Sequence, residues 1–190
     1  SKNYQEALRH LLRYMKGTSS QKLYLGTTEA DLQVYSDSSF TDCKKSGKST
    51  AGYIVKFRGG TVDWKSSLQK TVALSTAEAE HIAMSNAVRE GQAMHNLLQE
   101  LFIPTTGCYT CYIDNQAALS MANSSLSSAR TRHISVRYHY LRDLAAQGSV
   151  ELQYVSTAAQ LADAMTKPLP GPTFCRLRSA VLSAPVDTES

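Results

Sequence analysis

Four acidic residues stand at places in the sequence where carboxylates could hold a metal ion. Asp37 closes the alternating segment LQVYSD and Asp114 closes CYTCYID, so each follows a run that is predicted to be a β-strand. Glu80 lies within the helical segment ALSTAEAEHIA, and Asp163 lies in QLADAMTKPL. Four carboxylates without clustered histidine or cysteine favour a hard, oxygen-binding cation such as Mg²⁺.

Each of these acids also has an ordinary structural interpretation when it is taken alone. An aspartate after a strand commonly starts a turn or caps a helix. Asp163 could be a solvated helix residue, and a distant basic side chain could pair with Glu80. The metal site is therefore a hypothesis that rests on the four residues together.

Glu78 and Glu80 need separate explanations, because a helix turns about 100° per residue and they point to nearly opposite sides. Ser75 followed by Glu78 fits a capping box at the start of a helix. The helical neighbours of Glu78 are polar: His81, Ser85 and Arg89. Those of Glu80 are small: Ala83, Ala87 and Gly91. We expect Glu80 to face the packed side, where an ionised carboxylate is costly without a cation or hydrogen bonds.

The elements that must position these acids follow from periodicity and turn signals. Strands are predicted at 32–37, 50–57, 61–64, 108–113 and 150–155, and helices at 4–16, 75–102, 116–122, 134–147 and 158–165. This order predicts an α/β fold with a mixed sheet covered by helices. If the first and fourth strands are parallel neighbours, Asp37 and Asp114 meet at the carboxyl end of the sheet.

Composition sets limits on the class of protein. The chain has 190 residues, 42% of them hydrophobic, which suits one medium domain with a short appendage. No run approaches the ~20 apolar residues of a membrane span, and SKNYQEALRH lacks the layout of a signal peptide. We therefore expect a soluble intracellular protein whose scattered cysteines stay reduced. The net charge of +4 permits a polyanionic partner without requiring one.

Basic residues gather in two segments. One is RTRHISVRYHYLRD, which carries Arg130, Arg132, Arg137 and Arg142. The other follows Asp37 and carries Lys44, Lys45 and Lys48. Contacts with nucleic-acid phosphates and an ordinary solvated helix face both explain the first segment. Neither segment is expected to read a base sequence.

Several segments in their order and spacing resemble one known family. They are YSDSSFTD, KSTAGYIV, VALSTAEAEHIA, IDNQAALSMA, RTRHISVRYHYLRD and QLADAMTKPL. Together they resemble the ribonuclease H domain at the end of the polyprotein of copia-type LTR retrotransposons. The resemblance suggests a ribonuclease H domain at 31–170, the end of a preceding reverse transcriptase at 1–30, and an unassigned tail at 171–190.

The resemblance implies a ribonuclease H-like fold, a mixed five-stranded sheet with helices on both faces. It implies an endonuclease that hydrolyses the RNA strand of RNA·DNA hybrids with two Mg²⁺ ions, for which Mn²⁺ could substitute. The family's catalytic and metal-binding acids correspond to Asp37, Glu80, Asp114 and Asp163. Asp37 would bridge both ions, Asp163 would hold the ion that activates water, and Glu80 and Asp114 the leaving-group ion. The implied partners are the hybrid and the reverse transcriptase of the same polyprotein, with no membrane, in cytoplasmic virus-like particles or the nucleus.

One departure from related enzymes leaves alternatives open. Many cellular ribonucleases H carry a histidine just before the last catalytic helix, whereas this chain has VSTAAQLAD there. His133 and His139 are candidates by proximity in the motif, and surface histidines are their ordinary interpretation. Two rival functions are a weak or domesticated domain that only binds nucleic acid or makes structural contacts, and a DNA nuclease or integrase on the same scaffold. The intact acids argue against the first, and the contexts AEAEHIA and TKPL argue against the second.

Overall fold

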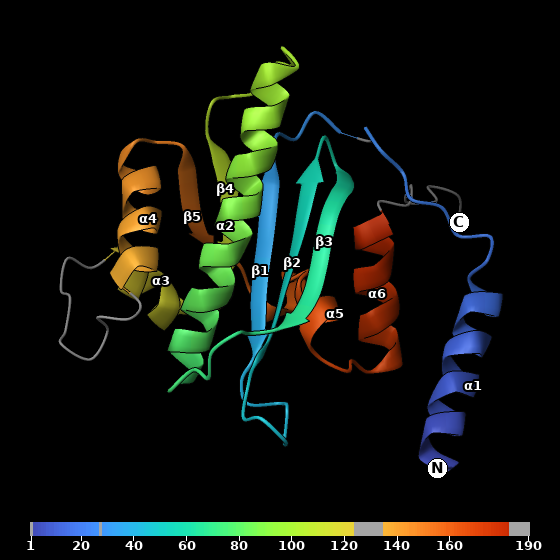
Figure 1. The fold of residues 1–190 in the computed structure, drawn as a ribbon. Helices are drawn as coiled ribbons and strands as arrows, with labels where there is room; N and C mark the ends of the chain where they lie inside the picture. The colour runs from blue at the N-terminus through green and yellow to red at the C-terminus, as the bar shows by residue number, and fades with distance from the viewer. Residues whose placement is uncertain (1, 27, 124–134, 183–190) are drawn as a thin grey trace.

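A five-stranded mixed sheet forms the centre of the protein, in a computed structural model that describes residues 2–26, 28–123 and 135–182. The strands are β1 (Gln33–Ser39), β2 (Thr50–Phe57), β3 (Gly60–Leu68), β4 (Tyr109–Ile113) and β5 (Val150–Tyr154). Their order across the sheet is β3-β2-β1-β4-β5 (Figure 1). Strands β1, β4 and β5 are parallel neighbours, while β1–β2 and β2–β3 are antiparallel. The predicted α/β fold with its parallel first and fourth strands is confirmed.

Helices cover both faces of this sheet. They are α2 (Thr76–Glu100), α3 (Gln116–Asn123), α4 (Ser135–Ala146), the short 3₁₀ helix η2 (Thr157–Ala159), α5 (Asp163–Thr166) and α6 (Gly171–Leu182). The helices α2, α3 and α4 pack on one face, and α5 and α6 pack on the other (Figure 1). None of the helices in these ranges is long and apolar enough to cross a membrane.

Alternation along β1 explains why both faces need a cover, because successive strand residues point to opposite sides. Val34 is fully buried in the larger core beneath α2. Tyr35 packs into the smaller core with Ile54 and Leu177 of α6. Asp37 lies on the same side of β1 as Tyr35, so its side chain faces α5.

The strand that carries Asp37 is longer than predicted. It continues to Ser39 because Asp37, Ser38 and Ser39 pair with β2, with Asp37 opposite Gly52. Its parallel pairing with β4 ends earlier, at Ser36 and Ile113. The prediction that Asp37 ends its strand is therefore wrong for the antiparallel edge, although Asp37 does lie directly beyond the parallel ladder.

The region after β5 also differs from the sequence interpretation. The helix predicted at 158–165 is wrong in its middle, because a 3₁₀ turn at Thr157–Ala159 is separated from α5 at Asp163–Thr166. Residues 171–182, which the pattern left unassigned, form α6, and Leu177 of this helix is 1% exposed in the smaller core. A single buried leucine in a weakly patterned segment offers little periodicity to detect.

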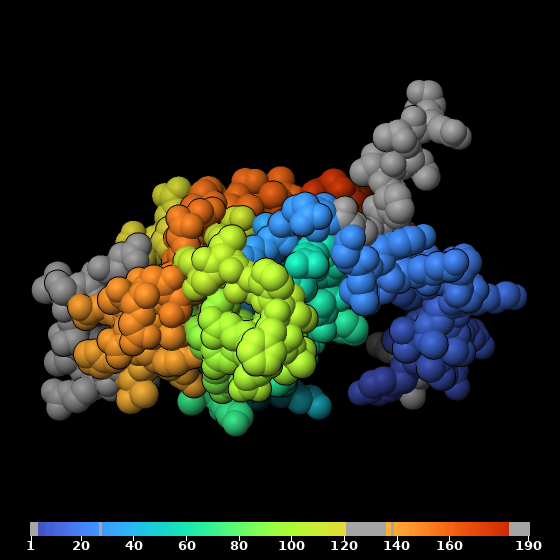
Figure 2. All heavy atoms as spheres, turned by 90° about the horizontal axis from the view of Figure 1, so that it is seen from above, coloured from blue at the N-terminus to red at the C-terminus, as the bar shows by residue number. Residues whose placement is uncertain are grey.

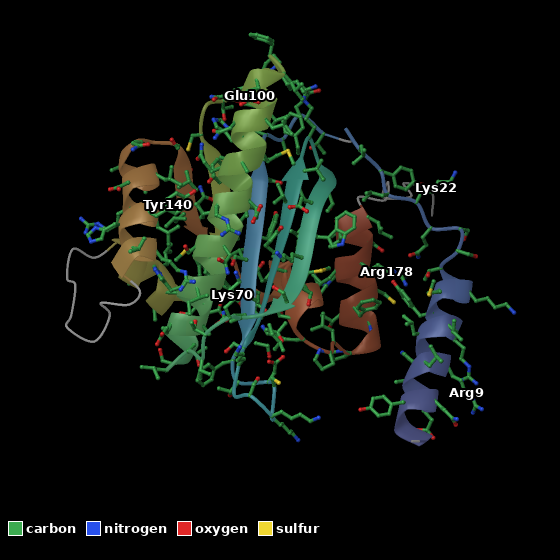
Figure 3. The ribbon with its side chains drawn as sticks, in the orientation of Figure 1. Arg9, Lys22, Lys70, Glu100, Tyr140 and Arg178 are labelled. Carbon is green, nitrogen blue, oxygen red and sulfur yellow. The ribbon has the colours of Figure 1, made fainter. Side chains whose placement is uncertain are left out.

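The first helix, α1 (Lys2–Gly17), forms as predicted and lies at the opposite end of the molecule from α4 (Figures 1 and 2). It meets α6 through Tyr14, whose ring lies edge-on to Phe174 at 5.7 Å. The guanidinium of Arg178, labelled in Figure 3, lies over both rings. The predicted apolar stripe is only half covered, since exposure is 52–58% for its members Leu8, Leu11, Leu12 and Met15.

Candidate active site

Three aspartates from separate elements converge at one end of the sheet. Asp37 comes from β1, Asp114 directly follows β4, and Asp163 is the first residue of α5. One carboxylate oxygen from each lies within 4.8 Å of the other two. Asp37 and Asp163 are buried, at 0% and 5% exposure, and Asp114 is half-buried. The expected meeting of Asp37 and Asp114 is found because parallel strands bring their carboxyl ends to the same edge.

Glu80 lies beside this group but outside the 4.8 Å set. Its side chain is 5% exposed, as the helical-face argument expected. Burial, followed by the negative charges of Asp37 and Asp114, raises the pKa of Glu80 to about 8. Its Oε2 is buried with no hydrogen-bond partner among the described residues. A bound cation would satisfy a buried acceptor that lies next to three carboxylates.

Glu78 takes part in capping the start of the same helix. The Ser75 hydroxyl accepts a hydrogen bond from the backbone N–H of Glu78 at 3.1 Å, as predicted for a capping box. The Glu78 carboxylate reaches back one residue further than the motif predicts and accepts from the N–H of Leu74 at 2.9 Å. The side chains of Ser75 and Glu78 therefore each accept a hydrogen bond from a backbone N–H at the start of α2.

The polar face of α2 is buried rather than solvated in its first turns. Glu78 is 6% exposed and His81 is 0% exposed, because α3 and α4 pack over this side of the helix. Burial, followed by the charge of Arg137, lowers the pKa of His81 to about 4, so its imidazole is neutral near pH 7. Helical periodicity separated the two glutamates correctly, but it did not show that both sides of α2 are covered.

A short segment after β5 supplies hydrogen bonds to all three aspartates. The Lys167 ammonium donates to Asp37 Oδ1 at 3.2 Å and to Asp163 Oδ1 at 2.9 Å. The Thr166 hydroxyl donates to Asp37, and the Thr157 hydroxyl donates to Asp114 Oδ2 at 3.0 Å. The sequence interpretation did not assign these donors. Only the Lys167–Asp163 pair had a local signal, since residues four apart on a helix are neighbours.

The charges of this cluster oppose one another. Burial raises the pKa of Asp163, the hydrogen bond from Lys167 opposes that rise, and the charge of Asp37 adds to it. Burial alone would lower the pKa of Lys167, but its hydrogen bond to Asp163 and the charge of Asp37 raise it overall. The site therefore contains one cationic side chain, that of Lys167, among several carboxylates, and its net charge is negative.

A glycine lets α5 approach the strand that carries the site. Gly52 of β2 lies opposite Asp37. A Cβ atom at Gly52 would stand 2.5 Å from Met165 Cβ and 2.8 Å from Thr166 Cγ2, closer than real Cβ contacts. The absence of a side chain at this position therefore allows Asp163 and Thr166 to reach Asp37.

The donor set of the cluster fits a hard divalent cation. Its ligand atoms are carboxylate oxygens, and no histidine or cysteine joins the group among the described residues. Carboxylate oxygens are the ligands that Mg²⁺ and Mn²⁺ prefer. The unpartnered Glu80 Oε2 adds an acceptor beside them. The group can thus hold a divalent metal ion.

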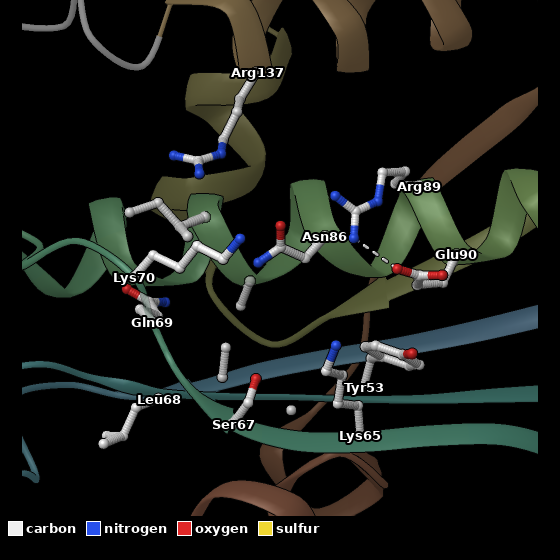
Figure 4. A pocket seen from close by; sticks show the side chains of 14 residues that line it. Tyr53, Lys65, Ser67, Leu68, Gln69, Lys70, Asn86, Arg89, Glu90 and Arg137 are labelled. Carbon is white, nitrogen blue, oxygen red and sulfur yellow. Dashed lines mark hydrogen bonds and ion pairs between the residues drawn. The ribbon is translucent and has the colours of Figure 1, made fainter.

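A basic hollow lies beside the acidic cluster, between α2 and the strands β2 and β3 (Figure 4). It encloses about 200 Å³, and its cationic side chains are Lys65, Lys70, Arg89 and Arg137. Glu90 is the only acid among the described residues that line it, and it pairs with Arg89 at 2.7 Å. Arg137 points from α4 toward Asn86 and Lys70 across the hollow.

The predicted basic residues occupy different surroundings. Lys44 and Lys45 are exposed and Lys48 is half-exposed in the loop between β1 and β2, at the same end of the sheet as Asp37. Arg142 is exposed on α4. The predictions for Arg130, Arg132 and His133 lie outside the described residues.

Comparisons with known proteins connect this site to one group of sequences. No family model matches the chain. It is 38% identical over 173 residues to the retrovirus-related Pol polyprotein from transposon TNT 1-94 of Nicotiana tabacum, covering 91% of this chain and 13% of that protein. It is 35% identical over 178 residues to the corresponding polyprotein from transposon RE1 of Arabidopsis thaliana, covering 93% and 12%. The chain thus spans about an eighth of the length of these relatives.

Solved structures with a similar fold are more distant in sequence. RNase H1 from Halobacterium salinarum aligns with a TM-score of 0.52 at 16% identity, covering 72% of this chain and 95% of that one. LC11-RNase H1 in complex with an RNA/DNA hybrid aligns with a TM-score of 0.50 at 10% identity, covering 72% and 94%. Similarity at this level of identity concerns the fold.

Proposed function

Because the chain is homologous to part of the retrovirus-related Pol polyproteins of plant transposons and has the fold of ribonuclease H domains, we propose that it hydrolyses the RNA strand of RNA·DNA hybrids. The convergence of Asp37, Asp114 and Asp163, with Glu80 beside them, is the observation that carries this proposal. Homology and fold alone would equally suit a domain that has lost its activity, since a fold does not guarantee chemistry.

The four acids are proposed to hold Mg²⁺, with Mn²⁺ as a substitute. When bound, such ions make water nucleophilic near neutral pH and stabilise negative charge on the leaving oxygen. Asp37 is the central ligand of this proposal, because it is fully buried and already oriented by Thr166 and Lys167. Asp114 is oriented by Thr157 in the loop where related enzymes carry a histidine.

Glu80 is proposed to contribute to the choice of RNA over DNA. The ribose 2′-hydroxyl is the group by which a protein distinguishes the two, and it can donate a hydrogen bond. The Glu80 carboxyl adjoins the aspartate cluster, where the scissile phosphate would lie. A 2′-hydroxyl next to that phosphate could donate to it.

The basic hollow and the lysines after β1 are proposed to bind the nucleic-acid backbone. Arg89 follows Glu80 by nine residues on α2, about 13 Å at the usual helical rise. A duplex centred on the acids would therefore extend over the hollow, where Lys70 and Arg137 could neutralise a phosphate. LC11-RNase H1, which is similar in fold, is described with a bound RNA/DNA hybrid.

A reverse transcriptase of the same polyprotein is the proposed protein partner. The relatives are Pol polyproteins that are far longer than this chain. Helix α1 presents a stripe of leucines and a methionine that are each more than half exposed. Such a stripe is typical of a helix that packs against another protein surface.

Incubation with labelled RNA·DNA, RNA·RNA and DNA·DNA duplexes, with Mg²⁺ or with EDTA, tests the function. We expect cleavage of RNA only within the hybrid and only when Mg²⁺ is present. Cleavage of duplex DNA, or hybrid cleavage that survives EDTA, would contradict the proposal. Binding of the hybrid without any cleavage would instead support a domain that only binds nucleic acid.

A further inference from the structure

One buried side-chain amide joins the two strands that carry the aspartates. Gln160 lies between η2 and α5 and is 0% exposed. Its Nε2 donates to the backbone carbonyl of Ser36 at 3.0 Å and to that of Tyr112 at 3.4 Å. Ser36 directly precedes Asp37, and Tyr112 stands two residues before Asp114.

The other end of the same amide reaches the third aspartate. Gln160 Oε1 accepts a hydrogen bond from the backbone N–H of Ala162 at 3.2 Å. Ala162 directly precedes Asp163 and is the N-cap of α5. One side chain therefore bonds to the backbone within two residues of each aspartate in the cluster.

These contacts fall at the last pairs of the parallel ladder between β1 and β4. The parallel ladder between β1 and β4 ends at Ser36 and Ile113, directly before Asp37 and Asp114. Beyond that point the ladder does not set the distance between the two strands. The Gln160 amide adds a link between the two strands just before that point, because its N–H groups bond to a carbonyl on each strand.

The contacts of Gln160 differ in kind from those of Lys167 and Thr157. Lys167 and Thr157 bond to the carboxylate oxygens, which are the atoms that would bind a metal ion. Gln160 bonds to backbone atoms only, so an ion held by the aspartates would not compete with it.

We infer that Gln160 is a positioning residue that sets the separation of the three aspartates and thereby makes the site favour Mg²⁺ over larger divalent ions. The inference rests on the proposed function for the identity of the ion. Mg²⁺ requires near-ideal octahedral geometry at about 2.0–2.1 Å, whereas Ca²⁺ accepts flexible geometries at about 2.3–2.6 Å. Loosening the spacing should therefore weaken Mg²⁺ binding more than Ca²⁺ binding.

The test compares Gln160→Met with Gln33→Met in Mg²⁺ and Ca²⁺ titrations followed by NMR chemical shifts. Methionine keeps the length of glutamine and removes the amide. Gln33 is a matched control at the start of β1, where its Nε2 donates to the Tyr112 hydroxyl at 3.4 Å. For Gln160→Met we expect Mg²⁺ affinity to fall about tenfold, the scale of lost outer contacts in metal sites, and Ca²⁺ affinity to fall about twofold. Gln33→Met should leave both affinities unchanged.

Equal losses for the two ions, or no loss, would overturn the inference, as would a wild-type protein that binds Ca²⁺ at least as tightly as Mg²⁺. If Gln160→Met does not fold, Gln160→Asn keeps the amide and shortens its reach. It should show a smaller loss that is still selective for Mg²⁺, and wild-type behaviour of Gln160→Asn would count against the inference. Because the titration requires no cleavage, a protein that binds Mg²⁺ selectively but does not cut the hybrid would refute the proposed function alone.

Discussion

The acidic cluster and the basic hollow are built in opposite ways. In the cluster, Asp37 and Asp163 are buried, and hydrogen bonds from one short segment orient the aspartates. In the hollow, cations from β3, the following loop, α2 and α4 surround an open space. Arg89 forms the one ion pair found there among the described side chains.

This difference suits different tasks. Chemistry at a phosphodiester requires ligands held in place before the substrate arrives, and buried, hydrogen-bonded carboxylates meet that requirement. Attraction of a charged backbone tolerates flexible side chains, since it depends on charge and little on geometry. Substitutions in the cluster should therefore change the rate of cleavage, and substitutions in the hollow should change affinity and its dependence on salt.

Asp37→Asn should have the largest effect. The change removes one negative charge from the centre of the cluster with little change in shape, and several kcal/mol of transition-state stabilisation correspond to a rate loss of about a thousandfold. Cleavage of labelled hybrid under single-turnover conditions measures it. Asp42→Asn is the control, because Asp42 lies in the exposed loop nearby and accepts a hydrogen bond from the Thr50 hydroxyl. The Asp42→Asn protein should cleave the hybrid at the normal rate. A near-normal rate for Asp37→Asn would show that the cluster does not take part in catalysis.

The next largest effect should be a difference between substitutions of the two glutamates of α2, Glu78 and Glu80. Glu80→Gln should slow cleavage by about a hundredfold through loss of a metal ligand, while the metal-free fold near pH 7 stays about equally stable, because burial already keeps this carboxyl largely protonated there. Glu78→Gln should keep both properties, since an amide oxygen can still accept from Leu74. Glu78→Ala should lower the free energy of unfolding by about 0.5–1 kcal/mol and leave cleavage intact. Paired melts and cleavage rates decide this, and the reverse pattern would refute the two assignments.

In the hollow, Arg137→Ala and Lys70→Ala should weaken hybrid binding a few-fold and leave the single-turnover rate at saturation unchanged. If each side chain neutralises one phosphate, each variant should reduce the slope of log affinity against log salt concentration by about one unit. Arg9→Ala on α1 serves as the distant control. Equal salt slopes for all these proteins would show that the hollow does not contact the backbone.

The smallest expected effect is a pH dependence of stability without metal. The pKa of Glu80 is raised from 4.5 to about 8 in the folded protein, so between these values the folded state binds more protons than the unfolded state. The free energy of unfolding must then fall as pH rises through this range. Neutral His81 opposes this trend only below pH 6.5.

Melting temperatures between pH 6.5 and 8.5 in EDTA isolate the contribution of Glu80. The wild type should lose a few degrees over this range, and Glu80→Gln should lose less. Parallel curves for the two proteins would contradict a raised pKa of Glu80, because they would show no difference in its protonation between the folded and unfolded states over this range.

Residue patterns along the chain predicted those parts of the site that depend on strand alternation or helical periodicity. Alternation placed Asp37 and Asp114 near the ends of parallel strands, and helical periodicity placed Glu80 on a packed side. Asp163 has no such signal: it was a candidate only as a fourth carboxylate, and the resemblance to retrotransposon ribonucleases H gave it a specific role. The structure brings its carboxylate to the other two aspartates.

The supporting contacts could not be predicted in this way. Gln160 and Thr166 reach β1 across 124 and 129 residues, and neither occupies a position that a period of 2 or 3.6 would mark. The burial of Glu78 escaped prediction for a related reason, since it depends on how α3 and α4 pack against α2. Contacts between distant segments depend on the tertiary arrangement rather than on local preference.

Because the aspartates depend on the segment from Thr157 to Lys167, the metal site can form only late in translation. A ribosome adds about 5–20 residues per second, so roughly 6–25 s separate the emergence of Asp37 from that of Asp163. During that interval β1, β2, β3 and α2 can assemble through their mutual contacts. Gln160, Thr166 and Lys167 have not yet arrived, and Gly52 leaves the place for α5 open. A nascent chain should therefore pass through a stage with most of its sheet formed and no competent metal site.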